Sequence, residues 1–191
     1  GWRPVGPQNL SRRLFSDLEL FKANGIRGTD FDCVVDSWST RGLDYYVVAK
    51  AHLNYDRLAY DDLLDDYCRA GFGKAAGTMK EYFLAVERMS DAAAVACGKD
   101  SRPEYDASFA FSSWHYLEAT DPDLLRTLLT KARNRAGDDP EVQKRIRFIA
   151  VGVKALAQEK RIAEEFKKLC PPGQYVIRVG SPELNDLRRK Y

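Results

Sequence analysis

The sequence predicts a mainly α-helical fold with one extended segment near its N-terminal end. Apolar residues recur every three or four positions over several long stretches, which is typical of amphipathic helices. Asp-Pro pairs at 121–122 and 139–140 provide helix starts, and Gly25 and Gly137 provide helix ends. Between residues 26 and 38 the apolar period changes to two, which indicates a strand.

Composition limits the possible functions. The chain has 191 residues and is 45% hydrophobic, enough to bury the core of one domain. The 30 Lys and Arg residues nearly balance the 28 Asp and Glu residues, for a net charge of +2. No basic run interleaves with aromatic residues, so we expect no nucleic-acid partner. No window of roughly 18 consecutive apolar residues is present, so we expect no membrane span.

The N-terminal residues have neither the charged nor the apolar region of a signal peptide. Because the chain begins at Gly1 without Met, we expect it to be a piece of a longer protein, and this absence does not bear on the parent. Localisation is therefore left open.

The first half of the chain predicts four helices. Leu10, Leu14, Leu18 and Phe21 have helical spacing before Asn24-Gly25. The apolar pattern then predicts helices over about 40–53, about 60–70 and about 75–97. The break at 71–73 is interpreted as a turn between helices. It lacks the spacing of a phosphate-binding loop.

The second half predicts one short helix, two longer helices and two short terminal elements. An aromatic helix is expected over about 107–119, followed by helices at 122–136 and 140–169. Each of the last two begins with Asp-Pro. Pro171-Pro172 ends the last of them, and residues 174–179 are compatible with a short strand before a small helix that starts near Ser181.

The extended segment needs partners, because a strand exposes unpaired backbone N–H and C=O groups. A two-stranded sheet is marginal by itself, so the simplest interpretation places this strand in a sheet whose other strands are missing. Residues 1–55 then form the last β/α unit of a (β/α)8 barrel, and residues 56–191 form a helical C-terminal domain. The alternative is an α-helical protein with one extended linker.

Side-chain direction along this strand gives the candidate site. Alternate residues point to opposite faces of a strand. One face carries Asp30, Asp32, Asp36 and Trp38, and the other carries Phe31, Cys33 and Val35. Active sites of barrels lie at the carboxyl ends of strands, which here means near Asp36 and Trp38. A carboxylate beside an indole can hold a sugar through hydrogen bonds and an aromatic face. For Asp30 and Asp32, solvation or a structural ion pair is the competing interpretation.

Four stretches resemble a known family. They are GIRG at 25–28, WSTRGLDYYVVAK at 38–50, YDDLLDDYCRAGFGKAA at 60–76 and MKEYF at 79–83. They resemble the C-terminal part of proteins with domain of unknown function 4838, which are related to α-glucuronidase-like glycoside hydrolases. The resemblance covers about residues 20–90. The chain departs from the family at 51–56, where AHLNYD replaces the family's "LLWDP".

The resemblance implies a sugar-processing parent, secreted or periplasmic, whose remaining barrel strands precede this chain. Asp36, Trp38 and Arg41 would line the substrate mouth. A glycosidase needs two positioned carboxylates, and in such barrels these come from strand ends that are absent here. We therefore expect the chain to be inactive by itself, with carbohydrate as the partner of the parent and no cofactor or metal. The alternative is a non-catalytic helical interaction or polysaccharide-binding module.

The cysteines and histidines of the chain form no recognisable catalytic or metal-binding motif. Cys33, Cys68, Cys97 and Cys170 are far apart, which excludes a compact zinc site. Cys68 and Cys97 lie on apolar helix faces, so buried thiols are favoured over two long-range disulfides. His52 and His115 are interpreted as structural, and the aromatic cluster around Phe109 and Trp114 as core rather than a ligand platform.

Overall fold

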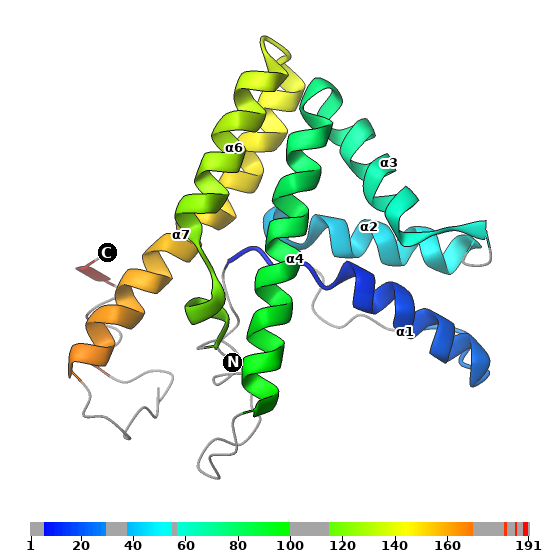
Figure 1. The fold of residues 1–191 in the computed structure, drawn as a ribbon, viewed down its shortest axis with the longest axis horizontal. Helices are drawn as coiled ribbons and strands as arrows, with labels where there is room; N and C mark the ends of the chain where they lie inside the picture. The colour runs from blue at the N-terminus through cyan, green and yellow to red at the C-terminus, as the bar shows by residue number, and fades with distance from the viewer. Residues whose placement is uncertain are drawn as a thin grey trace.

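A computed structural model gives the fold of the chain. The structure describes residues 6–29, 38–54, 57–99 and 115–169, together with residues 182, 186, 189 and 190. The described part is mainly helical (Figure 1). Its helices are α1 (Ser11–Ala23), α2 (Trp38–Asn54), α3 (Tyr60–Phe72), the 3₁₀ turn η2 (Gly73–Ala75), α4 (Ala76–Lys99), α6 (Pro122–Ala136) and α7 (Pro140–Leu169). Residues 115–119 are also helical.

Local sequence signals explain the helix ends. The Asp121 carboxylate accepts hydrogen bonds from the amides of Asp123 and Leu124, both at 3.0 Å, and so caps α6. Asp139 caps α7 in the same way, through the amides of residues 141 and 142. Gly137 ends α6 with a φ of 58°, which favours glycine. Both Asp-Pro predictions are thereby confirmed.

Two predicted boundaries need correction. Helix α3 continues through Gly71 to Phe72, and Gly73, with a φ of 48°, ends it. Trp38 was expected at the end of the extended segment, but it is the first residue of α2. Its ring contacts that of Tyr45, two helical turns further on, at a centroid distance of 4.9 Å. This contact is available only because residues 38–45 are helical.

The predicted strand at 31–35 lies outside the described residues, as do the short strand at 174–179 and the aromatic cluster at 109–114. The barrel unit and the division into 1–55 and 56–191 stay predictions. None of the described helices is long and apolar enough to cross a membrane.

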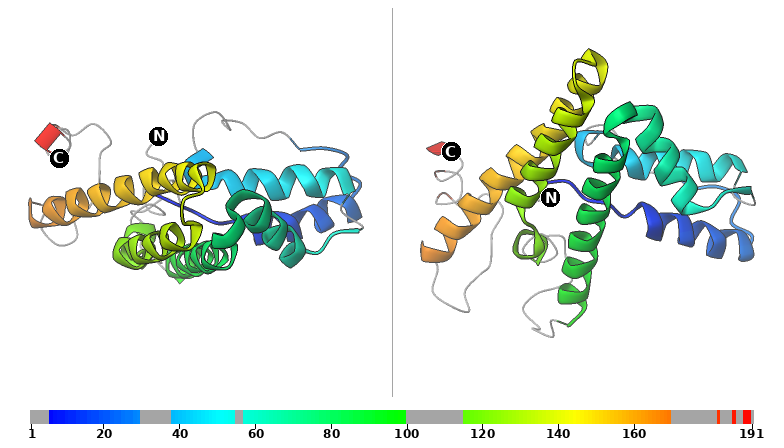
Figure 2. Two further views of the ribbon diagram at one scale, coloured as in Figure 1. Left: turned by 90° about the horizontal axis from the view of Figure 1, so that it is seen from above. Right: turned by 45° about the horizontal axis from the view of Figure 1, so that its top comes forward.

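The helices pack in two layers (Figure 2). One layer contains α2 and α7, and the other contains α3, α4 and α6. Helix α4 packs on α3 and α6, α6 packs on α7, and α2 packs on α1, α3 and α7. The core between the layers includes fully buried Leu64, Met79, Leu125, Ile146 and Leu156. The α2–α7 contact is close enough that a Cβ on Gly152 would lie 2.4 Å from the Thr40 methyl group.

The segment before α1 is buried in this body. The side chains of Asn9 and Ser11 are nearly inaccessible to solvent. The amide of Gln8 donates to the carbonyl of Thr40 at 3.3 Å, and the hydroxyl of Tyr116 donates to the carbonyl of Pro7. Residues 6–11 therefore connect α2, α4 and residues 115–119.

Candidate functional site

A groove lined by several aromatic side chains lies between α2, α3 and α7. Its volume is about 570 Å³, and we call it the aromatic groove. It is lined by Trp38, Gly42, Tyr45, Tyr46, Ala49, Tyr67, Ala70, Gly71, Phe72, Arg145, Phe148 and Ile149. Helix α2 supplies Trp38, Gly42, Tyr45, Tyr46 and Ala49 at helical spacing, so one face of α2 forms one wall.

Two aromatic side chains of the groove are open to solvent. Trp38 is 55% exposed and Phe148 is 52% exposed, although the average large apolar side chain prefers burial. Trp38 is held edge-on by Tyr45, and Tyr46 packs against Tyr67 with ring centroids 5.2 Å apart. The exposed indole of Trp38 is therefore supported by an aromatic neighbour.

Polar groups at the groove are few and positioned by helices. The Tyr46 hydroxyl donates to the carboxylate of Asp66. The Arg145 guanidinium donates to the carbonyl of Gly71 at 3.0 Å, near the C-terminal end of α3. Burial raises the pKa of both Tyr46 and Tyr67 to about 12, so both side chains are neutral hydroxyls at neutral pH.

A second hollow lies on the α1 side of α2. Its volume is about 420 Å³, and its lining includes Leu10, Leu14, Arg41, Asp44 and His52. Tyr45 and Ala49 line both hollows, so α2 separates them.

Asp44 is the most perturbed acid at this second hollow. The residue is 3% exposed, and burial raises its pKa to about 7. The Arg41 guanidinium, 3.8 Å away, and the amides of Leu10 and Ser11 oppose this shift because they favour the charged form. The Leu10 amide donates to the Asp44 carboxylate at 3.0 Å. Asp44 thus occupies the positive N-terminal end of α1, where a carboxylate is stabilising.

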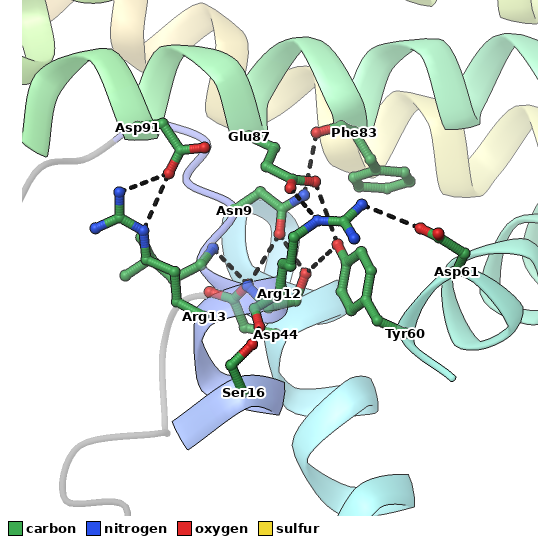
Figure 3. Close-up of polar contacts among 12 residues, drawn as sticks. Asn9, Arg12, Arg13, Ser16, Asp44, Tyr60, Asp61, Phe83, Glu87 and Asp91 are labelled. Atoms are coloured by element: carbon green, nitrogen blue, oxygen red, sulfur yellow. Dashed lines mark hydrogen bonds and ion pairs between the residues drawn. The ribbon is translucent and has the colours of Figure 1, made fainter. Parts of the chain in front are cut away.

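Beside Asp44, a polar cluster surrounds the start of α1 (Figure 3). The Asn9 amide group donates to the carbonyl of Phe83 at 3.1 Å, and the hydroxyls of Ser11 and Tyr60 are 2.8 Å apart. The Arg12 guanidinium lies 4.1 Å from the centre of the Tyr60 ring.

Ion pairs complete this cluster on its solvent side. Arg12 binds Glu87 at 2.6 Å and Asp61 at 3.0 Å, and Arg13 binds Asp91 at 2.7 Å. Every labelled polar side chain in Figure 3 has a partner, so the cluster fastens α1 to α3 and α4.

The three predicted site residues do not all meet. Trp38 lines the aromatic groove, whereas Arg41 lines the second hollow and donates to Gln8 Oε1 at 2.7 Å. Asp36 lies outside the described residues, as do Asp30 and Asp32. The assignment of Asp36, Trp38 and Arg41 to one substrate mouth stays a prediction.

Other predicted features can be located. Both ring nitrogens of His52 are hydrogen-bonded, to Thr29 Oγ1 at 2.7 Å and to the Val48 carbonyl at 2.8 Å, which fits a structural histidine. Cys68 is a buried free thiol, as predicted. His115 is buried, and its ring lies 4.0 Å from Glu118. Within the described ranges no group of His, Cys, Asp and Glu side chains is arranged to hold a metal ion.

Sequence reasoning missed most of the groove. Tyr45 and Tyr46 were available as a signal, because they follow Trp38 by two helical turns. Phe148 and Arg145 gave no signal, since they lie about a hundred residues away on α7.

The fold and groove define a helical bundle with an open aromatic surface. No family model, curated protein or solved structure matches the chain.

Proposed function

We propose that this chain binds carbohydrate at the aromatic groove, as the helical C-terminal part of a glycoside-hydrolase-like protein. The observation that carries the proposal is the exposed indole of Trp38, fixed by Tyr45 at the rim of an aromatic-walled groove. Sugar rings present C–H faces that pack on such indoles, and their hydroxyls bind nearby polar groups. The resemblance at 38–50 and 60–76 supports the same class of ligand.

In this proposal α2 is the last helix of a (β/α)8 barrel, and the strand expected from the sequence at 31–35 precedes it. The other strands belong to the parent protein. In the proposal Asp36 would contact the substrate beside Trp38, whereas Arg41 lines the second hollow, across α2 from the aromatic groove.

The chain is proposed to bind without hydrolysing. Hydrolysis of a glycoside needs an acid and a second carboxylate on either side of the scissile bond. None of the described residues that line the aromatic groove is Asp or Glu. The groove therefore offers stacking surfaces and hydroxyls but no acid–base pair.

Affinity electrophoresis in gels that contain soluble xylan, mannan or mixed-linkage β-glucan tests the proposal. We expect at least one polysaccharide to retard the chain, and Trp38→Ala and Phe148→Ala to reduce the retardation at least fivefold. Leu124→Ala is the control, because Leu124 is 42% exposed on α6 and outside the groove. Equal retardation of all variants, or none with any polysaccharide, would remove the proposal.

The same protein should release no reducing ends from these polysaccharides. Turnover by the purified chain would show that it carries a catalytic pair outside the groove.

A further inference from the structure

We infer that Arg145 determines the specificity of the aromatic groove, and that it selects polysaccharides whose sugar rings carry two free neighbouring hydroxyl groups. In this inference the Arg145 guanidinium donates to both oxygens of the pair while the sugar ring stacks on the aromatic side chains. The inference rests on the proposed carbohydrate binding and names the class of polysaccharide that the groove prefers.

Arg145 is the only charged residue among the described residues that line the groove. The other lining residues are aromatic, aliphatic or glycine. Because none of them is Asp or Glu, the lining provides no carboxylate that would compete with a ligand for the guanidinium. Arg145 is also exposed, so a ligand in the groove can reach it.

One nitrogen of the guanidinium is held in place, and the others are available. Nη1 of Arg145 donates to the carbonyl of Gly71 at 3.0 Å, in the last turn of α3. The carbonyls at this end of a helix carry partial negative charge, which favours a cation beside them. No other residue in the described part of the chain pairs with Arg145. A guanidinium has several N–H donors in one plane, so most of them remain for a ligand.

Phe148 places an aromatic ring beside this guanidinium. It follows Arg145 by three residues on α7, and residues at this spacing are neighbours on one face of a helix. Phe148 is 52% exposed, and both residues line the groove. A sugar ring that stacks its C–H face on an aromatic ring directs its equatorial hydroxyls sideways. Arg145 is therefore placed to meet hydroxyls at the edge of a sugar that stacks on Phe148.

The guanidinium suits a pair of oxygen atoms. Its N–H groups form a rigid fork that can donate two parallel hydrogen bonds. Neighbouring hydroxyl oxygens on a sugar ring can accept both bonds. A β-1,4-linked xylan or mannan keeps such a pair, O2 and O3, on each ring. In a β-1,3-linked glucan O3 belongs to the linkage, so the free ring oxygens O2 and O4 are not neighbours.

Affinity electrophoresis of the purified chain compares soluble β-1,4-linked xylan and mannan with soluble β-1,3-linked glucan, whose rings can also stack. We expect Arg145→Gln to weaken binding to xylan or mannan at least fivefold and to leave binding to the glucan unchanged, whereas Trp38→Ala should weaken both. Arg145→Lys keeps the charge but not the fork, so it should not restore the lost binding. Arg147→Gln is the matched control, because Arg147 is exposed on the same helix and does not line the groove.

A carboxylate offers a similar pair of oxygens, so a carboxymethylated form of the β-1,3-linked glucan is the third probe. If Arg145→Gln weakens binding to this form alone, the selected group is a carboxylate and the inference is wrong. Equal weakening for xylan and the unmodified glucan would mean that Arg145 only holds α3 against α7. That result would also overturn the inference.

If the chain binds xylan or mannan but not the glucan, urea denaturation provides the control for folding. Loss of binding in Arg145→Gln with an unchanged unfolding transition would then support the inference. If Trp38→Ala abolishes binding while Arg145→Gln binds every polysaccharide like the unmodified chain, the proposed function stands and this inference is wrong. If no polysaccharide is bound, both fail together.

Discussion

Thr40 of α2 packs directly on Gly152 of α7, with its methyl group 2.4 Å from the place where a Cβ on Gly152 would stand. This contact sets how closely α2 approaches α7. Trp38 and Phe148 of the aromatic groove come from these same two helices.

We predict that Gly152→Ala destabilises the chain by about 1–3 kcal/mol, the usual cost of overpacking. Helix propensity alone would stabilise an alanine by about 1 kcal/mol relative to glycine. Gly77→Ala, which meets no neighbour within 4 Å, should show that gain. Urea denaturation measures both. Thr40→Ser removes the methyl group and keeps the hydroxyl, so it should recover most of the loss in the double variant. If the free-energy changes of Gly152→Ala and Thr40→Ser simply add in the double variant, the contact between these residues is not the cause of the destabilisation.

We predict that Asp44 makes stability fall as the pH rises from about 4 to about 7. Burial raises the folded-state pKa from 3.8 to about 7, so between these values the folded chain binds a proton that the unfolded chain has lost. Stability from this group is complete below the unfolded pKa and has been lost once the pH passes the folded pKa.

Urea denaturation of the unmodified chain and of Asp44→Asn over this pH range tests the sign. As the pH rises, the unfolding free energy of the unmodified chain should fall relative to that of Asp44→Asn. Once the pH passes the folded-state pKa, the difference between the two should stay constant. A shift in favour of the unmodified chain would mean that Arg41 and the α1 amides outweigh burial.

We predict that Cys68 resists alkylation in the folded chain. Its side chain is buried, and burial raises the pKa of the thiol to about 12, so almost no thiolate forms at pH 8. Iodoacetamide labelling followed by peptide mass spectrometry should find the Cys68 peptide unmodified in buffer and modified in urea. Equal labelling under both conditions would show that α3 opens readily.

We predict that Asp121→Ala costs about 0.5–2 kcal/mol, the range for losing a helix cap. Its carboxylate accepts hydrogen bonds from two amides at the start of α6. Asp123→Ala is the matched control, since Asp123 forms only an exposed ion pair with Arg126, worth about 0–1 kcal/mol. Thermal denaturation should separate the two variants by several degrees. Equal losses would assign the effect to charge at the helix start rather than to capping.

Helix ends that are marked by a proline or a glycine could be predicted from the sequence. Pro122 and Pro140 can begin a helix, and Gly137 can end one, whatever lies around them. Gly71 shows the limit of such signals. It was interpreted as part of a break, but burial of Phe72 extends α3 through it. A glycine inside a helix costs only about 1 kcal/mol, which the packing of an aromatic ring outweighs.

The candidate site was less accessible to sequence reasoning. Trp38 was selected from the parity of a strand, yet it reaches the groove as the first residue of a helix. Phe148 completes the groove from α7, and nothing local to residue 148 marks it as a surface aromatic. Such a surface arises from packing between helices distant in sequence, which periodicity does not encode.

The burial of residues 6–11 has a consequence for the order of folding. The Asn9 amide binds Ser90, 81 positions away, and the Pro7 carbonyl binds Tyr116, 109 positions away. During synthesis this segment leaves the ribosome before α1. Its partners Thr40 and Asp44 follow soon after, whereas Ser90 and Tyr116 follow 81 and 109 residues later. Contacts of such long sequence separation close late. Residues 6–11 are therefore synthesised before the other described residues but reach their final positions late. Until they do, the space that they fill between the helices stays open.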